Sequence, residues 1–296
     1  MTENFTSTKE KPVVVLKDLA KNYGKTVALQ KVTFNVYQGE IFGLLGQNGA
    51  GKTTTLRVLK AMIKPTLGSA FVLEKDVMND KKWVKQHTGY LPEEGSLLSR
   101  LTPLELCEYI GGLFGLSVEN SRQRAMYFLE IFDLLKKKDA LIEELSRGMK
   151  QKLSIICSII HDPEIVLMDE PLASLDPSAA RMVKDFIRYL AKEKGKTIII
   201  SSHRLGLVED VCDRVAILFE GKILAIDSPK GIIEETQTTN LEEAYLALIP
   251  GYEQPMMTTN GSLVEGAEER AITADLEEPE SQHHTLKNQT NESRQE

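Results

Sequence analysis

The chain has 296 residues, of which 42% are hydrophobic and 27% are charged, and its formal net charge is −7. This length predicts one main domain with a sizeable core and additional segments. No apolar run approaches the roughly 20 residues that cross a bilayer, so we expect no membrane span. We also expect no secretory signal, and the three widely spaced cysteines indicate reduced thiols in the cytosol rather than a disulfide or zinc framework.

The acidic residues are concentrated near the C-terminus. Residues 251–296 contain ten acidic and three basic side chains, whereas the rest of the chain is neutral. A neutral body without a basic stripe disfavours broad nucleic-acid binding, so no nucleic-acid partner is expected. The acidic segment, rich in Thr, Ser, Gln and Asn, is predicted to be largely disordered, either as a solvated spacer or with a partner.

Short apolar runs predict strands at 13–16, 32–36, 41–45, 165–169, 197–201, 215–219 and 222–226. Helical spacing predicts amphipathic helices at 103–114 and 121–135, and Asp176-Pro177 is typical of a helix start, with the helix running to about Lys194. The pattern predicts a mixed α/β core with an antiparallel N-terminal flank and a separate helical piece.

A glycine-rich loop follows the predicted strand at 41–45. Residues 46–53 read GQNGAGKT, which fits the phosphate-binding pattern G-x-x-x-x-G-K-[ST]. Glycines let backbone N–H groups approach phosphate oxygens, Lys52 supplies a cation, and the Thr53 hydroxyl can ligate Mg²⁺. A chance glycine-rich turn is the alternative, and the flanking strand and helix argue against it. The predicted nucleotide contacts in this loop are Gly46, Gln47, Asn48, Gly49, Ala50, Gly51, Lys52, Thr53 and Thr54.

Two carboxylates end the predicted strand at 165–169. Asp169 is expected to meet Mg²⁺ at the carboxyl end of this strand. Glu170, one residue further on, is suited to polarise the water that attacks a γ-phosphate, which makes it a catalytic candidate. An acidic pair in this position is often a solvated strand end, but Lys52 and Thr53 upstream favour a catalytic pair.

Residues 145–153 read LSRGMKQKL and resemble the signature sequence of ATP-binding cassette (ABC) proteins. The commonest form in that family is LSGGQ, from which Arg147 and Met149 depart. The resemblance implies that Ser146, Arg147, Gly148 and Met149 face the ATP of an opposite subunit.

Further landmarks occur in the order found in the family. Tyr23 resembles the aromatic residue that stacks on adenine, Asp176 lies in a segment similar to the loop that couples the two nucleotide sites, and His203 resembles the switch histidine that contacts the γ-phosphate. Each is weak alone, because single tyrosines and histidines are more often packing residues. Six landmarks in order over about 12–245 identify the chain as a member of the ABC ATPase family.

Glu93 stands where the family usually has a glutamine that touches Mg²⁺ or the attacking water. A carboxylate could keep the metal contact while adding negative charge near the phosphates. The alternative is that Glu93 is a surface acid and another group serves the metal.

The resemblance implies a P-loop NTPase fold, with a RecA-like mixed sheet, an antiparallel flank and an inserted helical subdomain that carries the signature. The predicted division is a flexible segment at 1–11, an ATPase domain at 12–235 with the helical subdomain at about 95–160, a C-terminal helix at 236–250 and the acidic tail at 251–296.

The single phosphate loop implies a dimer, because in the family the signature of one subunit faces the loop of the other. Two cassettes, identical or paralogous, would hold two ATP molecules with Mg²⁺ and drive separate transmembrane permease subunits from the cytoplasmic side of the cell membrane.

The sequences at 90–94, 146–152 and 240–245 resemble the corresponding segments of ATPases that serve exporters. An importer subunit is one alternative, although many importers carry glutamine at position 93. A soluble cassette protein acting on ribosomes or DNA is another, but no second cassette, coiled coil or zinc cysteines lie between 53 and 145. A regulator that binds ATP without turnover is a third, which Glu170 and His203 disfavour.

Overall fold

The computed structural model describes residues 11–252 except Glu94 and Ser96. The predictions for almost all of the flexible N-terminal segment and the acidic tail therefore lie outside the described residues. Residues 11–250 belong to one compact unit. Among the described residues, no helix combines the length and the apolar character needed to span a bilayer.

Six strands form the main sheet in the order β10-β9-β3-β8-β7-β6. All neighbours are parallel except β10, which pairs antiparallel with β9. The central strands are buried on both faces, as expected for a parallel sheet that is covered on both sides. The strands are β3 Ile41–Leu45, β6 Thr88–Leu91, β7 Ile165–Asp169, β8 Thr197–Ser202, β9 Arg214–Phe219 and β10 Lys222–Asp227.

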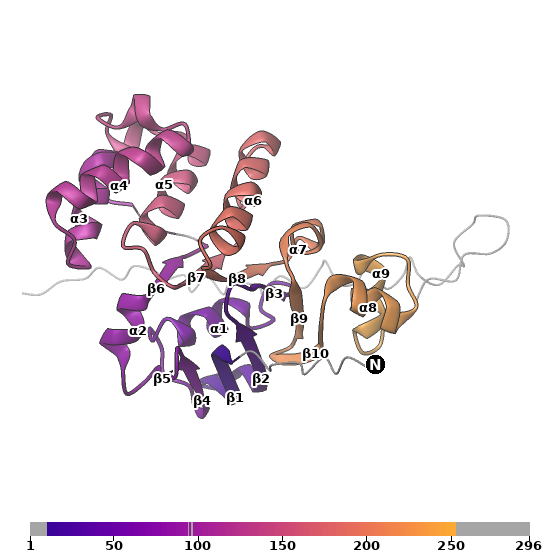
Figure 1. Cartoon of the computed structure of the whole chain (residues 1–296). Helices are drawn as coiled ribbons and strands as arrows, with labels where there is room; N and C mark the ends of the chain where they lie inside the picture. Colours follow the sequence, from indigo (N-terminus) through magenta and orange to yellow (C-terminus); the bar gives the residue numbers. More distant parts are fainter. Residues whose placement is uncertain (1–10, 94, 96, 253–296) are drawn as a thin grey trace, which may run out of the picture. The chain divides into compact units, whose positions relative to one another are not determined.

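A second, antiparallel sheet in the order β2-β1-β4-β5 forms a flank. It shares one hydrophobic core with α1 (Lys52–Leu59) and one face of the main sheet, where Phe34 of the flank stacks on Phe42 of β3 with ring centroids 5.0 Å apart. In Figure 1 the flank and α1 lie below the main sheet. The strands are β1 Pro12–Tyr23, β2 Thr26–Tyr37, β4 Leu67–Val72 and β5 Lys75–Asp76.

Helices cover the other face and form a separate layer, seen at the top of Figure 1. The helical subdomain consists of α3 (Pro103–Leu113), α4 (Val118–Ile131) and α5 (Arg147–Ile159). The caps Thr102, Ser117 and Ser146 each accept a hydrogen bond from the backbone N–H three residues on, which satisfies a free helix donor. The remaining helices are α2 Lys81–His87, α6 Pro177–Lys192, α7 Leu205–Val211, α8 Pro229–Thr236 and α9 Leu241–Leu248.

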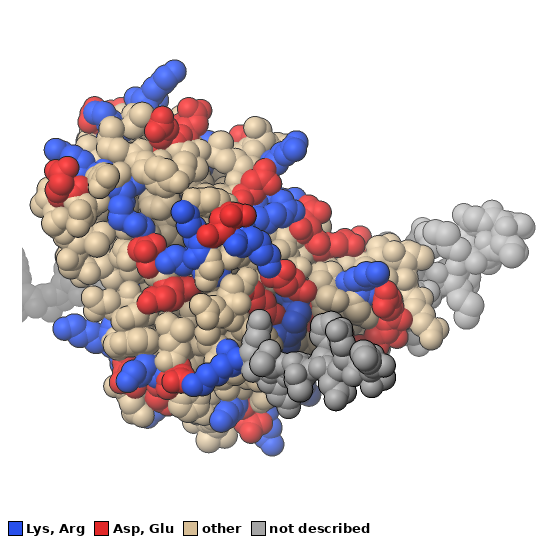
Figure 2. Space-filling model, viewed as in Figure 1, with Lys and Arg blue, Asp and Glu red and all other residues tan. Residues whose placement is uncertain are grey.

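Acidic and basic side chains are interspersed on the face shown in Figure 2. Two ion pairs tie α6 to the neighbourhood of α7: Lys184 to Asp210 at 2.6 Å and Lys192 to Asp213 at 2.8 Å. Exposed pairs of this kind contribute little stability, so the hydrophobic cores determine the fold.

The predicted α/β fold class is confirmed, and the strands predicted at 41–45 and 165–169 match β3 and β7 in full. The predicted helix at 121–135 was wrong at both ends. It begins at Val118 because Ser117 caps it, and it ends at Ile131, shortly before Asp133 takes a left-handed backbone with φ 53°. The sequence analysis also missed β4, β5, β6, α2 and α8, and the helix predicted at 236–250 is the shorter α9.

Candidate functional site

The parallel strands bring the predicted site residues to one edge of the main sheet. β3 leads into the loop before α1, β7 ends at Asp169, and β8 leads directly to His203. The carboxyl ends of parallel strands in open α/β sheets are the usual place for a ligand. A pocket of about 340 Å³ lies at this edge, and it is lined by Ala28, residues 48–54, Glu93, Asp169 and Glu170.

Two glycines of the loop have no room for a side chain. Gly51, at the start of α1, has φ 109°, and a Cβ there would lie 2.6 Å from the carbonyl oxygen of Ala28. A Cβ on Gly46 would lie 2.4 Å from the carbonyl oxygen of Leu218. Both distances are too short for a real contact, so the loop can take this path only with glycine at these positions.

Lys52 is buried and anchored to the loop itself. Its Nζ donates hydrogen bonds to the carbonyl oxygens of Gly46 at 2.7 Å and Gln47 at 3.0 Å. Burial lowers the pKa of Lys52, and the negative charges of Glu170 and Asp169 oppose that shift. The ammonium group therefore stands close to both carboxylates that the sequence analysis selected.

Asp169 is fully buried at the end of β7. One carboxylate oxygen, Oδ1, accepts a hydrogen bond from the hydroxyl of Ser201, which lies opposite Asp169 on β8. The other, Oδ2, is buried and has no hydrogen-bond partner among the described residues. A buried carboxylate oxygen without a donor is costly, and a cation is one group that can satisfy it.

Glu170 and His203 are in direct contact. Oε1 of Glu170 accepts a hydrogen bond from the backbone N–H of His203 at 2.9 Å and lies 2.7 Å from its Nδ1. Oε2 accepts a weaker bond from the hydroxyl of Ser202 at 3.3 Å. The backbone of Glu170 is left-handed, with φ 48°, which is unusual for a residue other than glycine. The two catalytic candidates thus form one rigid pair, and Nε2 of His203 is the nitrogen left to face another group.

Glu93 is exposed and lies between two pockets. It lines the pocket of the phosphate loop and also a neighbouring pocket of about 410 Å³, which contains Arg147 and Ser174. Its negative charge, like those of Asp169 and Glu170, acts to raise the pKa of Lys52. Glu93 is therefore close enough to the loop to influence its charge balance.

The structure does not bring the signature residues to the chain's own phosphate loop. Ser146 is the N-cap of α5 and accepts a hydrogen bond from the backbone N–H of Met149 at 3.3 Å. Arg147 lines the neighbouring pocket, and a Cβ on Gly148 would lie 3.5 Å from the carbonyl oxygen of Ser174. None of these residues lines the pocket of the loop.

Two other predicted residues have visible local roles. Asp176 caps α6, because its Oδ1 accepts a hydrogen bond from the backbone N–H of Ala179 at 2.9 Å. Tyr23 lies at the end of β1 with 46% of its surface exposed. Its ring faces the ammonium of Lys21, 4.9 Å from the ring centroid, and Tyr23 does not line the pocket.

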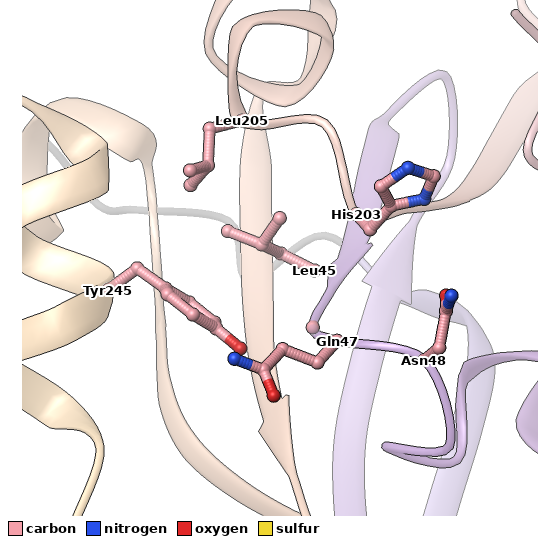
Figure 3. Close-up of a pocket in the computed structure, with 7 residues that line it drawn as sticks. Leu45, Gln47, Asn48, His203, Leu205 and Tyr245 are labelled. Carbon is pink, nitrogen blue, oxygen red and sulfur yellow. The ribbon is translucent and has the colours of Figure 1, made fainter. Parts of the chain in front are cut away.

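A second cavity of about 340 Å³ lies beside the loop (Figure 3). Gly46 and Gln47, predicted nucleotide contacts, line this cavity rather than the first. Tyr245 of α9 also lines it, and the sequence analysis did not select Tyr245 for the site. The only sequence signal for Tyr245 was the resemblance at 240–245, and Ala28, which lines the first pocket, had none.

Comparisons with known proteins agree with this geometry. The family model described as ABC transporter matches residues 29–173. An uncharacterised ABC transporter ATP-binding protein of Methanocaldococcus jannaschii is 42% identical over 212 residues, covering 72% of this chain and 76% of that protein. The Nod factor export ATP-binding protein I of a Rhizobium species is 36% identical over 225 residues, covering 76% of this chain and 74% of that protein.

The fold also matches a solved structure. The ATP-binding subunit of an ABC transporter superposes with a TM-score of 0.74 and 30% sequence identity, covering 80% of this chain and 99% of that chain. The match extends well beyond the segment found by the family model.

Proposed function

This chain belongs to the family of ABC transporter ATP-binding proteins, and on that basis we propose that it is the ATP-hydrolysing subunit of an exporter. The observation that carries the proposal is the convergence of Lys52, Asp169, Glu170 and His203 at the carboxyl ends of adjacent parallel strands. A phosphate-binding loop, a free carboxylate oxygen and a carboxylate–histidine pair at one edge are the parts that nucleotide hydrolysis requires.

The residues present fit a magnesium ion that accompanies ATP. Asp169 offers the buried, unpartnered Oδ2, and Thr53 lines the same pocket. Among the described residues, no group of three or more His, Cys, Asp or Glu side chains is arranged to hold a metal ion. Mg²⁺ commonly keeps several waters and phosphate oxygens, so one carboxylate and one hydroxyl are enough protein ligands. When bound, the ion would neutralise charge on the phosphates, and Glu93 is a further candidate ligand.

The chain's own residues account for the chemical step. The loop N–H groups and Lys52 would hold the β- and γ-phosphates in place. Glu170, fixed by three contacts to the end of β8, would accept a proton from the attacking water. His203 would use its free Nε2 to contact the γ-phosphate. A base held in this way orients the water without a further rearrangement.

A second cassette would complete each site. Ser146 caps α5, and Arg147, Gly148 and Met149 form its first turn; none of them lines the pocket of the chain's own loop. In a dimer these residues would face the ATP held by the partner's loop. Asp176 would couple the two sites, and the adenine ring would stack on Tyr23 once the ring of Tyr23 turns from Lys21. The partner is either a second copy or a paralogue.

Separate transmembrane subunits would convert the closing of the dimer into transport. The relative from Rhizobium is named for Nod factor export, and three segments of this chain resemble exporter ATPases. We therefore favour export over import and place the chain at the cytoplasmic side of the cell membrane, bound peripherally.

A pull-down tests the proposal. Tagged Glu170→Gln protein would be recovered from detergent-solubilised membranes of its host with ATP and Mg²⁺, and the co-purifying proteins would be identified. We expect a polytopic membrane protein together with a second cassette, and the same experiment with Lys52→Ala as a matched control should lose the ATP-dependent increase in recovery. Recovery of ribosomal or DNA-repair proteins without a membrane protein would overturn the transport function but leave the ATPase chemistry.

A further inference from the structure

Tyr245 connects the C-terminal helix to the phosphate loop. It lies on α9, whose residues Leu241 and Ala244 are fully buried in the main core. The ring of Tyr245 extends from this helix into the cavity beside the loop, where Leu45 and Leu205 contribute the apolar wall (Figure 3). The side chain is only 7% exposed, so its position is set by packing.

The hydroxyl of Tyr245 is buried and has no well-formed hydrogen bond among residues 11–93, 95 and 97–252. Its polar neighbour is Gln47, toward which it points in Figure 3. Burial raises the pKa of Tyr245, and the nearby backbone amide of Gln47 opposes this shift. A phenylalanine would give the same apolar contacts without burying an unpartnered hydroxyl, which is costly. Packing alone therefore does not explain a tyrosine here.

The Gln47 peptide takes part in the hydrogen bonds that hold the loop together. Its carbonyl oxygen accepts hydrogen bonds from Nζ of Lys52 at 3.0 Å and from the backbone N–H of Ala50 at 3.2 Å. The Lys52 ammonium also bonds the neighbouring carbonyl of Gly46 at 2.7 Å. An ammonium has three donors, and two of them are held by the carbonyl oxygens of Gly46 and Gln47, so the position of the Gln47 peptide determines where the Lys52 ammonium lies.

We propose that Tyr245 is a positioning residue for the phosphate loop: its hydroxyl accepts a hydrogen bond from the Gln47 peptide N–H when the loop binds ATP, and so holds the peptide whose carbonyl oxygen anchors Lys52. This inference rests on the proposed nucleotide site. It assigns a role in ATP binding to α9, which lies outside the segment matched by the family model.

The substitution Tyr245→Phe separates this role from packing, because it removes only the hydroxyl. We expect the dissociation constant for ATP to rise about threefold to tenfold, the range for one lost hydrogen bond. The melting temperature should stay the same or rise, because an unpartnered buried hydroxyl is removed. A residue that only packs α9 could not weaken binding while leaving the fold equally stable.

The experiment uses the full-length chain in the Glu170→Gln background, so that turnover does not deplete the nucleotide. Binding of a fluorescent ATP analogue with Mg²⁺ and thermal unfolding are measured for each variant. The matched control is Leu241→Ala on the same helix, which should lower the melting temperature and leave ATP affinity unchanged. Lys52→Ala should abolish binding and so verifies that the signal comes from the proposed site.

Two results would overturn the inference alone: equal ATP affinity in Tyr245→Phe and its parent, or loss of affinity only in proportion to loss of stability, as judged by Leu241→Ala. If the parent does not bind the analogue, or if Lys52→Ala binds as well as the parent, the proposed site fails and the inference fails with it.

Discussion

Glu170 and His203 hold each other in place, since one carboxylate oxygen meets both the backbone N–H and Nδ1 of the histidine, at 2.9 and 2.7 Å. The contact fixes the direction of Nε2 and keeps the carboxylate at the end of β8. The proposed base and the proposed phosphate contact share one hydrogen-bond network, so the effects of substitutions at the two positions should not be additive.

The first prediction concerns Glu170→Gln. The amide keeps the size of the side chain and can still accept a bond from His203, but it cannot take a proton from water. We expect ATP turnover to fall at least about 100-fold, the lower range for a general base, while ATP binding persists. Steady-state hydrolysis and equilibrium binding measure the two effects, and turnover close to wild type would show that Glu170 is not the base.

The second prediction concerns the metal and Asp169→Asn. Replacing one oxygen by an amide removes the charge that would attract Mg²⁺ at Oδ2. We expect the Mg²⁺ concentration for half-maximal turnover to rise at least about tenfold, equivalent to roughly 1.4 kcal/mol of binding free energy. A titration of activity with Mg²⁺ measures it. An unchanged Mg²⁺ requirement in Asp169→Asn would contradict the assignment. Glu93→Gln is measured in parallel, and an equal shift there would support Glu93 as a second ligand.

The third prediction concerns the shape of the loop. Gly51→Ala forces a Cβ to within 2.6 Å of the carbonyl oxygen of Ala28 and of Cδ2 of Leu29 at a backbone φ of 109°. We expect loss of ATP binding and a lower melting temperature. Gly112→Ala on α3 is the control, because a Cβ there has nothing within 4 Å and alanine favours a helix. Normal ATP affinity in Gly51→Ala would show that the loop tolerates a different path.

The loop motif and the Asp169-Glu170 pair could be predicted from the sequence because their chemistry depends on local spacing. Their meeting could also be expected, because each follows a strand of a parallel sheet. The hydrogen bond between Glu170 and Nδ1 of His203 could not be predicted, since it depends on the register of β7 against β8. Strand β4 begins with Leu67-Gly68-Ser69, which lacks a clear alternating pattern, and the flank imposes its strand pairing. Nothing local indicates that Tyr245 reaches a loop almost 200 residues earlier.

The fourth prediction concerns pH and His161. Burial lowers the pKa of His161 to about 4, and the ring stacks on Phe114 with centroids 3.7 Å apart. The pKa is about 6.5 in an unfolded chain. Between these two values the unfolded chain binds a proton that the folded chain does not, so this residue reduces the free energy of unfolding as pH falls from about 6.5 to about 4.

His161→Phe keeps a ring against Phe114 and removes the titration. We expect the free energy of unfolding to fall less in the variant than in wild type between pH 6.5 and pH 4. The loss of the hydrogen bond to the Thr88 carbonyl should also lower the free energy of unfolding of the variant by the same amount at every pH. Urea unfolding at a series of pH values measures both. Parallel curves over the whole range would show that His161 is not the group responsible.

The cap at the start of α6 has a mechanical consequence. Asp176 is bonded to the first turn of a 16-residue helix, which is about 24 Å long at 1.5 Å per residue. Along that length Phe186 packs edge-on against Phe132, beyond the end of α4, with centroids 4.9 Å apart. The N-terminus of α6 therefore lies at the expected contact with a second subunit, and its later turns lie in the helical layer. A displacement of Asp176 would therefore be transmitted through the cap and along α6 to the contact between Phe186 and Phe132 in the helical layer.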